Sequence, residues 1–135
     1  MNKLYLEPTS MCNLNCRTCF RNSWIGEKQG IMSDEILQKV YMYLRSENNL
    51  QTVMLAGMGE PLLHKNITEI VREISSSGKK TELLTNATLL NKKLCTELLD
   101  AGLDILWVSC DEAHLKSAKS SDKILQNIDY FKNLK

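Results

Sequence analysis

Three cysteines stand close together in the loop that follows the first strand-like run of the chain. Cys12 and Cys16 have three residues between them, and Cys16 and Cys19 have two. Thiolate is the ligand that zinc and iron–sulfur clusters prefer, and three thiolates in so short a loop can converge on one metal centre. Three protein ligands leave one coordination position open, which is typical of metal sites that carry out chemistry. The spacing therefore predicts a reactive metal or cluster site in this loop.

Polar or glycine-containing turns follow the other three runs that we interpret as strands. Residues 57–61 (Gly-Met-Gly-Glu-Pro) follow the second run, Asn86 follows the third, and Ser109 and Asp111 follow the fourth. Loops at the carboxyl ends of parallel strands meet over one edge of a sheet or one mouth of a barrel, where ligands bind. We therefore expect these residues and the three cysteines to form a single site.

The chain reads as four consecutive strand–helix units. Each unit takes about 34 of the 135 residues, as expected of strand–helix repeats joined by right-handed crossovers. The nearly continuous apolar run at residues 52–56 is typical of a strand covered on both faces, as in a parallel sheet. The sequence thus predicts one α/β domain over residues 1–135. The predicted strands are residues 3–7, 52–56, 81–85 and 104–109.

Short polar side chains mark the starts of the predicted helices. Ser33 is expected to cap a helix over residues 34–46, and Asn91 to cap the third helix. Asn66, with Glu69 three residues later, is typical of a capping box at the start of the second helix. A last helical pattern runs to the end of the chain.

Composition and charge narrow the classes of partner and compartment. Seventeen basic and sixteen acidic residues give a net charge of +1, so no bulk field favours nucleic acid or an anionic membrane. No stretch approaches the roughly 20 apolar residues of a membrane span, and the first residues do not resemble a signal peptide. We therefore expect a cytoplasmic protein. Its five cysteines favour metal ligation or free thiols over disulfides.

The cysteine loop and the turn after the second predicted strand carry a family resemblance. The CxxxCxxC arrangement of Cys12, Cys16 and Cys19, followed by Gly-Glu-Pro at residues 59–61, resembles the radical S-adenosylmethionine (radical SAM) superfamily. Leu-Glu-Pro-Thr-Ser before the first cysteine and Cys-Phe-Arg-Asn-Ser-Trp from the third are similar to members associated with tungsten- or molybdenum-cofactor maturation and with peptide modification. The resemblance implies a partial TIM barrel of alternating strands and helices.

The resemblance also implies a reaction and its cofactors. In the family the three thiolates hold a [4Fe–4S] cluster, whose fourth iron binds the amino and carboxylate groups of S-adenosylmethionine. An external one-electron donor then drives reductive cleavage to a 5′-deoxyadenosyl radical, which takes a hydrogen atom from the substrate. Here that substrate would be a small molecule or a peptide that the sequence does not identify. The residues that match the family's cofactor-binding positions are Gly57, Gly59, Glu60, Asn86, Ser109 and Asp111.

The chain departs from the family pattern in three ways. Met58 stands where another glycine is usual, and Thr18 stands where an aromatic residue often packs near adenine. The family core usually has six strand–helix units, whereas four are recognised here. The strand predicted at residues 104–109 would then be an apolar parallel edge, and such edges tend to pair with other chains. We therefore expect self-association through this edge.

Simpler interpretations stay open beside the family resemblance. The three cysteines could form a structural zinc site with His64 or His114 as the fourth ligand, although both histidines lie in polar stretches and are expected to be solvated. Asn86, Ser109 and Asp111 could merely shape turns. The protein could also be a cluster-binding or redox module without radical chemistry, or a structural fragment. Cys95 and Cys110 are expected to be small buried side chains without a function.

Overall fold

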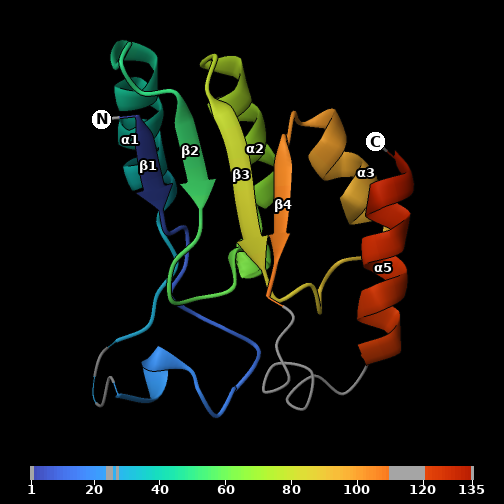
Figure 1. Cartoon of the computed structure of the whole chain (residues 1–135). Helices are drawn as coiled ribbons and strands as arrows, with labels where there is room; N and C mark the ends of the chain where they lie inside the picture. The colour runs from blue at the N-terminus through green and yellow to red at the C-terminus, as the bar shows by residue number, and fades with distance from the viewer. Residues whose placement is uncertain (1, 24–25, 27, 110–120, 135) are drawn as a thin grey trace.

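The computed structural model describes residues 2–23, 26, 28–109 and 121–134 (Figure 1). The strands are β1 (Lys3–Leu6), β2 (Thr52–Leu55), β3 (Lys80–Thr85) and β4 (Ile105–Val108). The helices are α1 (Asp34–Ser46), α2 (Ile67–Ser76), α3 (Lys92–Asp100) and α5 (Ser121–Leu134). Two short 3-10 helices span Phe20–Ser23 and Pro61–Leu63. Within the described ranges, none of the helices combines the length and the apolar character that crossing a lipid bilayer requires.

The four strands form one parallel sheet in the order β1-β2-β3-β4, which confirms the predicted α/β architecture. Leu6 pairs with Leu55, and Leu55 pairs with Leu83, so apolar side chains stand in a row across the sheet. Because every strand runs in the same direction, all four carboxyl ends lie at one edge, the lower edge in Figure 1. The loops that carry the chemistry start from this edge.

The helices lie on one side of the sheet, and the hydrophobic core fills the space between the two layers (Figure 1). Along β2, Val53 and Leu55 are fully buried, whereas Thr52 and Met54 on the opposite face are only partly buried. The prediction that this strand is covered on both faces was therefore wrong for the described chain. The largest fully buried side chains of the core include Leu44, Leu50, Leu55, Ile70, Ile74, Leu83, Leu90 and Leu98.

Two of the three predicted helix caps are confirmed. The Ser33 hydroxyl accepts a hydrogen bond from the Ile36 amide at 3.4 Å, and the Asn91 side chain accepts from Leu94 N at 3.0 Å. The capping box predicted at Asn66 was wrong, because the backbone there (φ −103°, ψ 24°) is not extended and the side chain caps nothing. The Asn66 amide instead donates to Asp34 at 3.2 Å and so joins the starts of α1 and α2.

The uncovered face of the sheet carries a network of charged and aromatic side chains. Glu82 on β3 accepts hydrogen bonds from Lys3 Nζ at 2.9 Å and from Trp107 Nε1 at 2.7 Å. Lys3 Nζ also lies 5.5 Å from the centre of the Tyr5 ring. The hydrogen bond from Lys3, and after it the one from Trp107, hold the pKa of the Glu82 carboxyl below its usual value. The network therefore links β1, β3 and β4 across the open face.

We expect the Lys3→Met variant to be less stable than the wild type by about 1–2 kcal/mol at neutral pH, because a charged hydrogen bond to a nearly buried carboxylate is lost. When folding lowers the pKa of a carboxyl group, that group stabilises the folded protein at every pH above the pKa it has in the unfolded chain. This contribution disappears as the pH falls through the pKa that the group has in the folded protein. The difference between variant and wild type should therefore shrink as the pH falls below about 4. Urea unfolding between neutral and acidic pH measures it.

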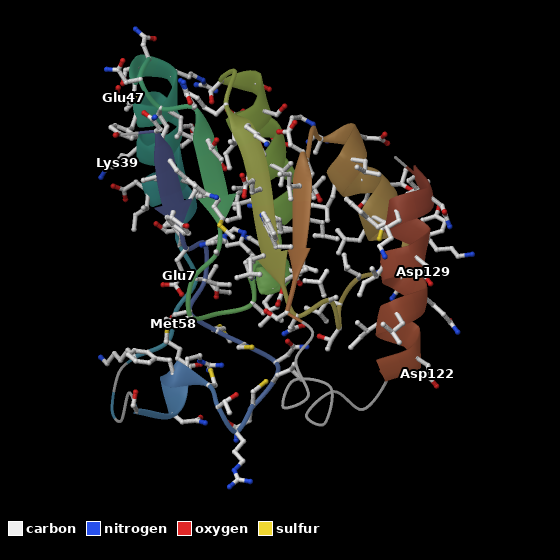
Figure 2. All side chains as sticks on the ribbon, viewed as in Figure 1. Glu7, Lys39, Glu47, Met58, Asp122 and Asp129 are labelled. Atoms are coloured by element: carbon white, nitrogen blue, oxygen red, sulfur yellow. The ribbon has the colours of Figure 1, made fainter. Side chains whose placement is uncertain are left out.

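Lys39→Met on α1 is the matched control for this prediction. Lys39 pairs with Glu35 at 2.8 Å, but both side chains are well exposed, so solvent screens the pair (Figure 2). This variant should change stability little at any pH. Equal pH dependence in the two variants would contradict the role assigned to Lys3 and Glu82.

Candidate cofactor site at the carboxyl edge of the sheet

A cavity of about 220 Å³ lies at the carboxyl edge of the sheet, where the loops after all four strands contribute to its wall. Every site residue expected from the sequence lines this cavity except Asp111, which lies outside the described residues. Loops that begin far apart in the sequence therefore enclose one space. The lining residues are Cys12, Cys16, Thr18, Cys19, Gly57, Met58, Gly59, Glu60, Leu84, Thr85, Asn86 and Ser109.

The three loop cysteines are free thiols of intermediate exposure. Backbone hydrogen bonds shape the loop, with Cys19 N donating to Cys16 O at 3.0 Å and Asn22 N donating to Cys19 O at 3.0 Å. The Asn22 side chain closes the same turn by donating to Cys16 O at 3.0 Å. Within the described residues, no three His, Cys, Asp or Glu side chains form a group that could hold a metal ion.

The turn after β2 packs directly against the backbone that leads into the cysteine loop. Glu60 N donates to Met11 O at 2.7 Å. A Cβ atom added to Gly59 would lie 2.6 Å from Met11 O and would also overlap the carbonyl oxygen of Thr9. Only glycine allows this approach without a backbone shift. Gly59 therefore sets the distance between the turn and the loop that bears Cys12.

Glu60 has its side chain turned into the protein. It is 2% exposed, and its carboxylate accepts hydrogen bonds from Thr85 Oγ1 at 2.7 Å, Asn86 N at 2.7 Å and Leu62 N at 3.0 Å. A buried carboxylate requires such donors, since an unpaired buried charge is costly. The side chain of Glu60 thus joins the turn after β2 to the end of β3, and only its remaining surface contributes to the cavity wall.

Asn86 links the end of β3 to the cysteine loop. Its amide nitrogen lies 3.7 Å from Cys12 Sγ and donates to Asn13 at 2.9 Å. Its oxygen accepts from Thr88 N at 3.0 Å and from the Thr88 hydroxyl at 2.6 Å. The Asn86 side chain is thus held in one orientation, with an N–H group beside the sulfur of Cys12.

Comparison with known protein families decides the classification. The family model described as "Radical SAM superfamily" matches residues 6–135. The chain belongs to the radical SAM superfamily. Its four parallel strands alternating with helices match the partial TIM barrel of that superfamily, as the sequence predicted.

Curated relatives agree with this assignment. The chain is 31% identical over 140 residues to the tungsten-containing aldehyde ferredoxin oxidoreductase cofactor-modifying protein of Pyrococcus furiosus, covering 96% of this chain and 39% of the relative. It is 34% identical over 119 residues to a probable GTP 3′,8-cyclase of Pyrococcus abyssi, covering 88% of this chain and 38% of the relative. The chain thus spans about two fifths of the length of these radical SAM relatives.

Solved structures show the same fold with S-adenosylmethionine (AdoMet) bound. The structure of histidine-tagged anSMEcpe with bound AdoMet superposes with a TM-score of 0.78 at 26% identity, covering 98% of this chain and 40% of the other. BtrN in complex with AdoMet and 2-DOIA gives a TM-score of 0.69 at 19% identity, covering 94% of this chain and 55% of the other. The likeness to BtrN concerns the fold alone.

The kinds of donor around the cavity suit a [4Fe–4S] cluster and S-adenosylmethionine, although the described side chains are not grouped as the ligands of one metal ion. Three free thiols line it, and an amide N–H faces one of them. Among the described residues, no donor occupies the carbonyl oxygens of Gly57, Met58 or Gly59, so three acceptors remain for a cationic group. Soft thiolates and oxygen acceptors within one cavity are the donor set that this pair of cofactors requires.

His64 departs from the prediction that it is solvated. It is 1% exposed, its Nδ1 accepts from Asn66 N at 3.2 Å, and its Nε2 lies 3.2 Å from Met32 O. Since the backbone amide must donate and the carbonyl must accept, the ring is neutral with its proton on Nε2. Both nitrogens are therefore occupied within the protein, and His64 is not among the residues of the cavity wall. His114 and Cys110 lie outside the described residues.

Sequence reasoning missed some residues in and around this cavity. Glu7, immediately after β1, accepts hydrogen bonds from the backbone amides of Met58 and Gly59. Leu84 and Thr85 form part of the cavity wall. Leu84 could have been found from the two-residue period of a strand, which places it on the opposite face from buried Leu83. Nothing in the spacing of residues marked Glu7.

Proposed function

We propose that the chain holds a [4Fe–4S] cluster through Cys12, Cys16 and Cys19 and binds S-adenosylmethionine in the adjoining cavity for reductive cleavage. One observation carries the proposal: the three cysteines and the turn at residues 57–60 line the same cavity. A cofactor held by the thiols would then lie beside the free backbone carbonyls of the turn.

The residues of the chain have separate tasks in this proposal. The three thiolates hold the cluster and leave one iron free for the amino acid end of S-adenosylmethionine. The carbonyl groups of residues 57–59 receive its ammonium group. Asn86 keeps an N–H beside Cys12, and Ser109 and Asp111 are proposed to contact the ribose or the carboxylate. When bound, the cluster would supply the electron that splits S-adenosylmethionine into methionine and the 5′-deoxyadenosyl radical.

The substrate is proposed to be a small molecule or a peptide, and the electron to come from an external one-electron donor. Support comes from the relatives, one of which is named for modifying a tungsten cofactor and another for cyclising GTP. A structure of anSMEcpe contains a bound peptide. We place the reaction in the cytoplasm, where thiols stay reduced.

Anaerobic reconstitution with iron and sulfide, followed by dithionite and S-adenosylmethionine, tests the proposal. The expected products are 5′-deoxyadenosine and methionine in equal amounts. A reconstituted protein with its full iron and sulfide content that gives no 5′-deoxyadenosine would be a cluster-binding module without radical chemistry. Stoichiometric zinc in place of iron would point to the structural site instead.

We also propose that the chain self-associates through an exposed sheet edge. The edge that we propose is β4, which among the described strands is paired only with β3, so one side of it has no strand partner. Multi-angle light scattering at micromolar concentrations should detect dimers or larger species whose share grows with concentration. A stable monomer throughout that range would contradict this prediction.

A further inference from the structure

The Glu7 carboxylate binds two successive amides of the turn after β2. Glu7 follows the last residue of β1, and its Oε1 atom accepts from Met58 N and from Gly59 N, the latter at 3.1 Å (Figure 2). Hydrogen bonds from amides to a carboxylate are about twice as strong as those between neutral groups. Glu7 therefore fixes two of the peptide groups that line the cavity.

Because a peptide group is planar, a contact that fixes its N–H also fixes the direction of its C=O. None of the described peptide bonds is cis, and in a trans peptide the C=O points opposite to the N–H of the next residue. The N–H groups of Met58 and Gly59 point to Glu7, and that of Glu60 points to Met11 O. The carbonyls of Gly57, Met58 and Gly59 are consequently all turned away from the β1 exit.

Gly57 gives Glu7 the space to make this contact. A Cβ atom added to Gly57 would lie 2.5 Å from both Cγ and Cδ of Glu7. The glutamate side chain thus lies across the glycine and reaches the next two amides. At Gly57 the side chain of Glu7 leaves no room for a Cβ atom, whereas at Gly59 the backbone of residues 9–11 leaves none.

We infer that Glu7 is the positioning residue that aims the carbonyls of the turn at the ammonium group of S-adenosylmethionine. This inference rests on the proposed function and assigns the orientation of two of the three ammonium acceptors, the carbonyls of Gly57 and Met58, to one side chain. Glu7 acts in two ways. Its hydrogen bonds orient the carbonyls, and its negative charge adds attraction for a cation behind the turn.

Three variants separate these effects. Glu7→Leu removes both the acceptor and the charge, whereas Glu7→Gln keeps an acceptor oxygen without the charge. Glu47→Leu is the matched control, because Glu47 is also half-buried and also accepts from a backbone amide, that of Asn49 at 3.1 Å (Figure 2). Glu47 follows α1 and precedes β2, and it lies at the upper edge of the sheet in Figure 2, whereas Glu7 and Met58 lie toward the lower, carboxyl edge.

Binding of S-adenosylmethionine to the reconstituted protein is measured by anaerobic calorimetry, together with binding of an analogue in which hydrogen replaces the α-amino group. We expect Glu7→Leu to weaken S-adenosylmethionine binding roughly ten- to hundredfold and Glu7→Gln by less than about tenfold. Iron content should be unchanged in both. The analogue should bind wild type and Glu7→Leu equally well, since it lacks the group that the carbonyls receive. Equal weakening of both ligands by Glu7→Leu would overturn the inference.

Hydrogen exchange of the cluster-free protein provides a readout that needs no cofactor. The amides of Met58 and Gly59 should be protected in the wild type and in Glu47→Leu, and should lose protection in Glu7→Leu. Free exchange of both amides in the wild type would overturn the role of Glu7 whatever the protein binds. A different outcome would refute the proposed function instead: the two amides are protected, the protein holds its cluster, and yet S-adenosylmethionine does not bind. The ligand assigned to these carbonyls would then be wrong as well.

Discussion

Replacing Cys12, Cys16 or Cys19 with alanine is expected to abolish cluster retention. After anaerobic reconstitution the wild type should hold about four iron and four sulfide ions per chain, and each variant only a small fraction of that. The reason is that, among the described residues that line the cavity, Cys12, Cys16 and Cys19 are the only thiols, so the loss of one leaves no thiol there to replace it. Cleavage of S-adenosylmethionine should fall below detection in all three variants. Iron and sulfide analysis with the visible absorption spectrum measures the effect.

Cys95→Ala is the matched control for the loop cysteines. Cys95 on α3 is fully buried in the core, and burial raises the pKa of its thiol, so it stays protonated at neutral pH and is a poor metal ligand. This variant should keep its iron and lose about 1 kcal/mol of stability. A loop variant that retained the full cluster, or a Cys95 variant that lost it, would contradict the ligand assignment.

Gly59→Ala should produce the second large effect, because the added methyl group meets backbone atoms that have no free rotation to avoid it. Its Cβ would lie 2.7 Å from the carbonyl carbon of Ser10 and 2.6 Å from Met11 O. The turn and the cysteine loop must then separate. We expect a loss of stability of about 1–3 kcal/mol and a fall in S-adenosylmethionine affinity of at least roughly tenfold. Thermal unfolding and calorimetry report the two effects separately.

Gly30→Ala tests whether this effect depends on the surroundings of Gly59. A Cβ added to Gly30 meets nothing within 4 Å, and the residue is exposed. This variant should bind S-adenosylmethionine like the wild type and unfold at nearly the same temperature. If Gly30→Ala and Gly59→Ala were equally harmless, the close approach of the turn to the loop would play no part in binding.

The parallel sheet and the place of the cavity could be predicted because they depend on short-range patterns. Strand-like runs separated by helical spacing define the order of the elements, and parallel strands necessarily bring their carboxyl ends to one edge. The cysteine spacing and the glycines at positions 57 and 59 then mark which loops meet there. Ser33 and Asn91 were predictable for the same reason, since a cap depends only on the next few residues.

The errors and omissions concern contacts between residues far apart in the sequence. His64 was expected to be solvated because its neighbours in the chain are polar, but its partner Met32 belongs to another loop. Asn66 was expected to bond its own helix, and instead reaches Asp34 on α1. Glu7 acts on a turn 51 residues later. Such contacts depend on how distant parts of the chain pack together, so the spacing of residues along the sequence does not predict them.

The order of the strands in the sheet has a consequence for how the site is assembled during synthesis. Each strand pairs with the strand made just before it, so the sheet can grow in the direction of translation. Once β2 and its turn have emerged, the chain already contains the three cysteines, Glu7 and the two glycines of the turn. The bond from Asn86 to Cys12, 74 residues apart, forms only after β3 is added. A nascent chain therefore acquires its cluster ligands early and encloses them late.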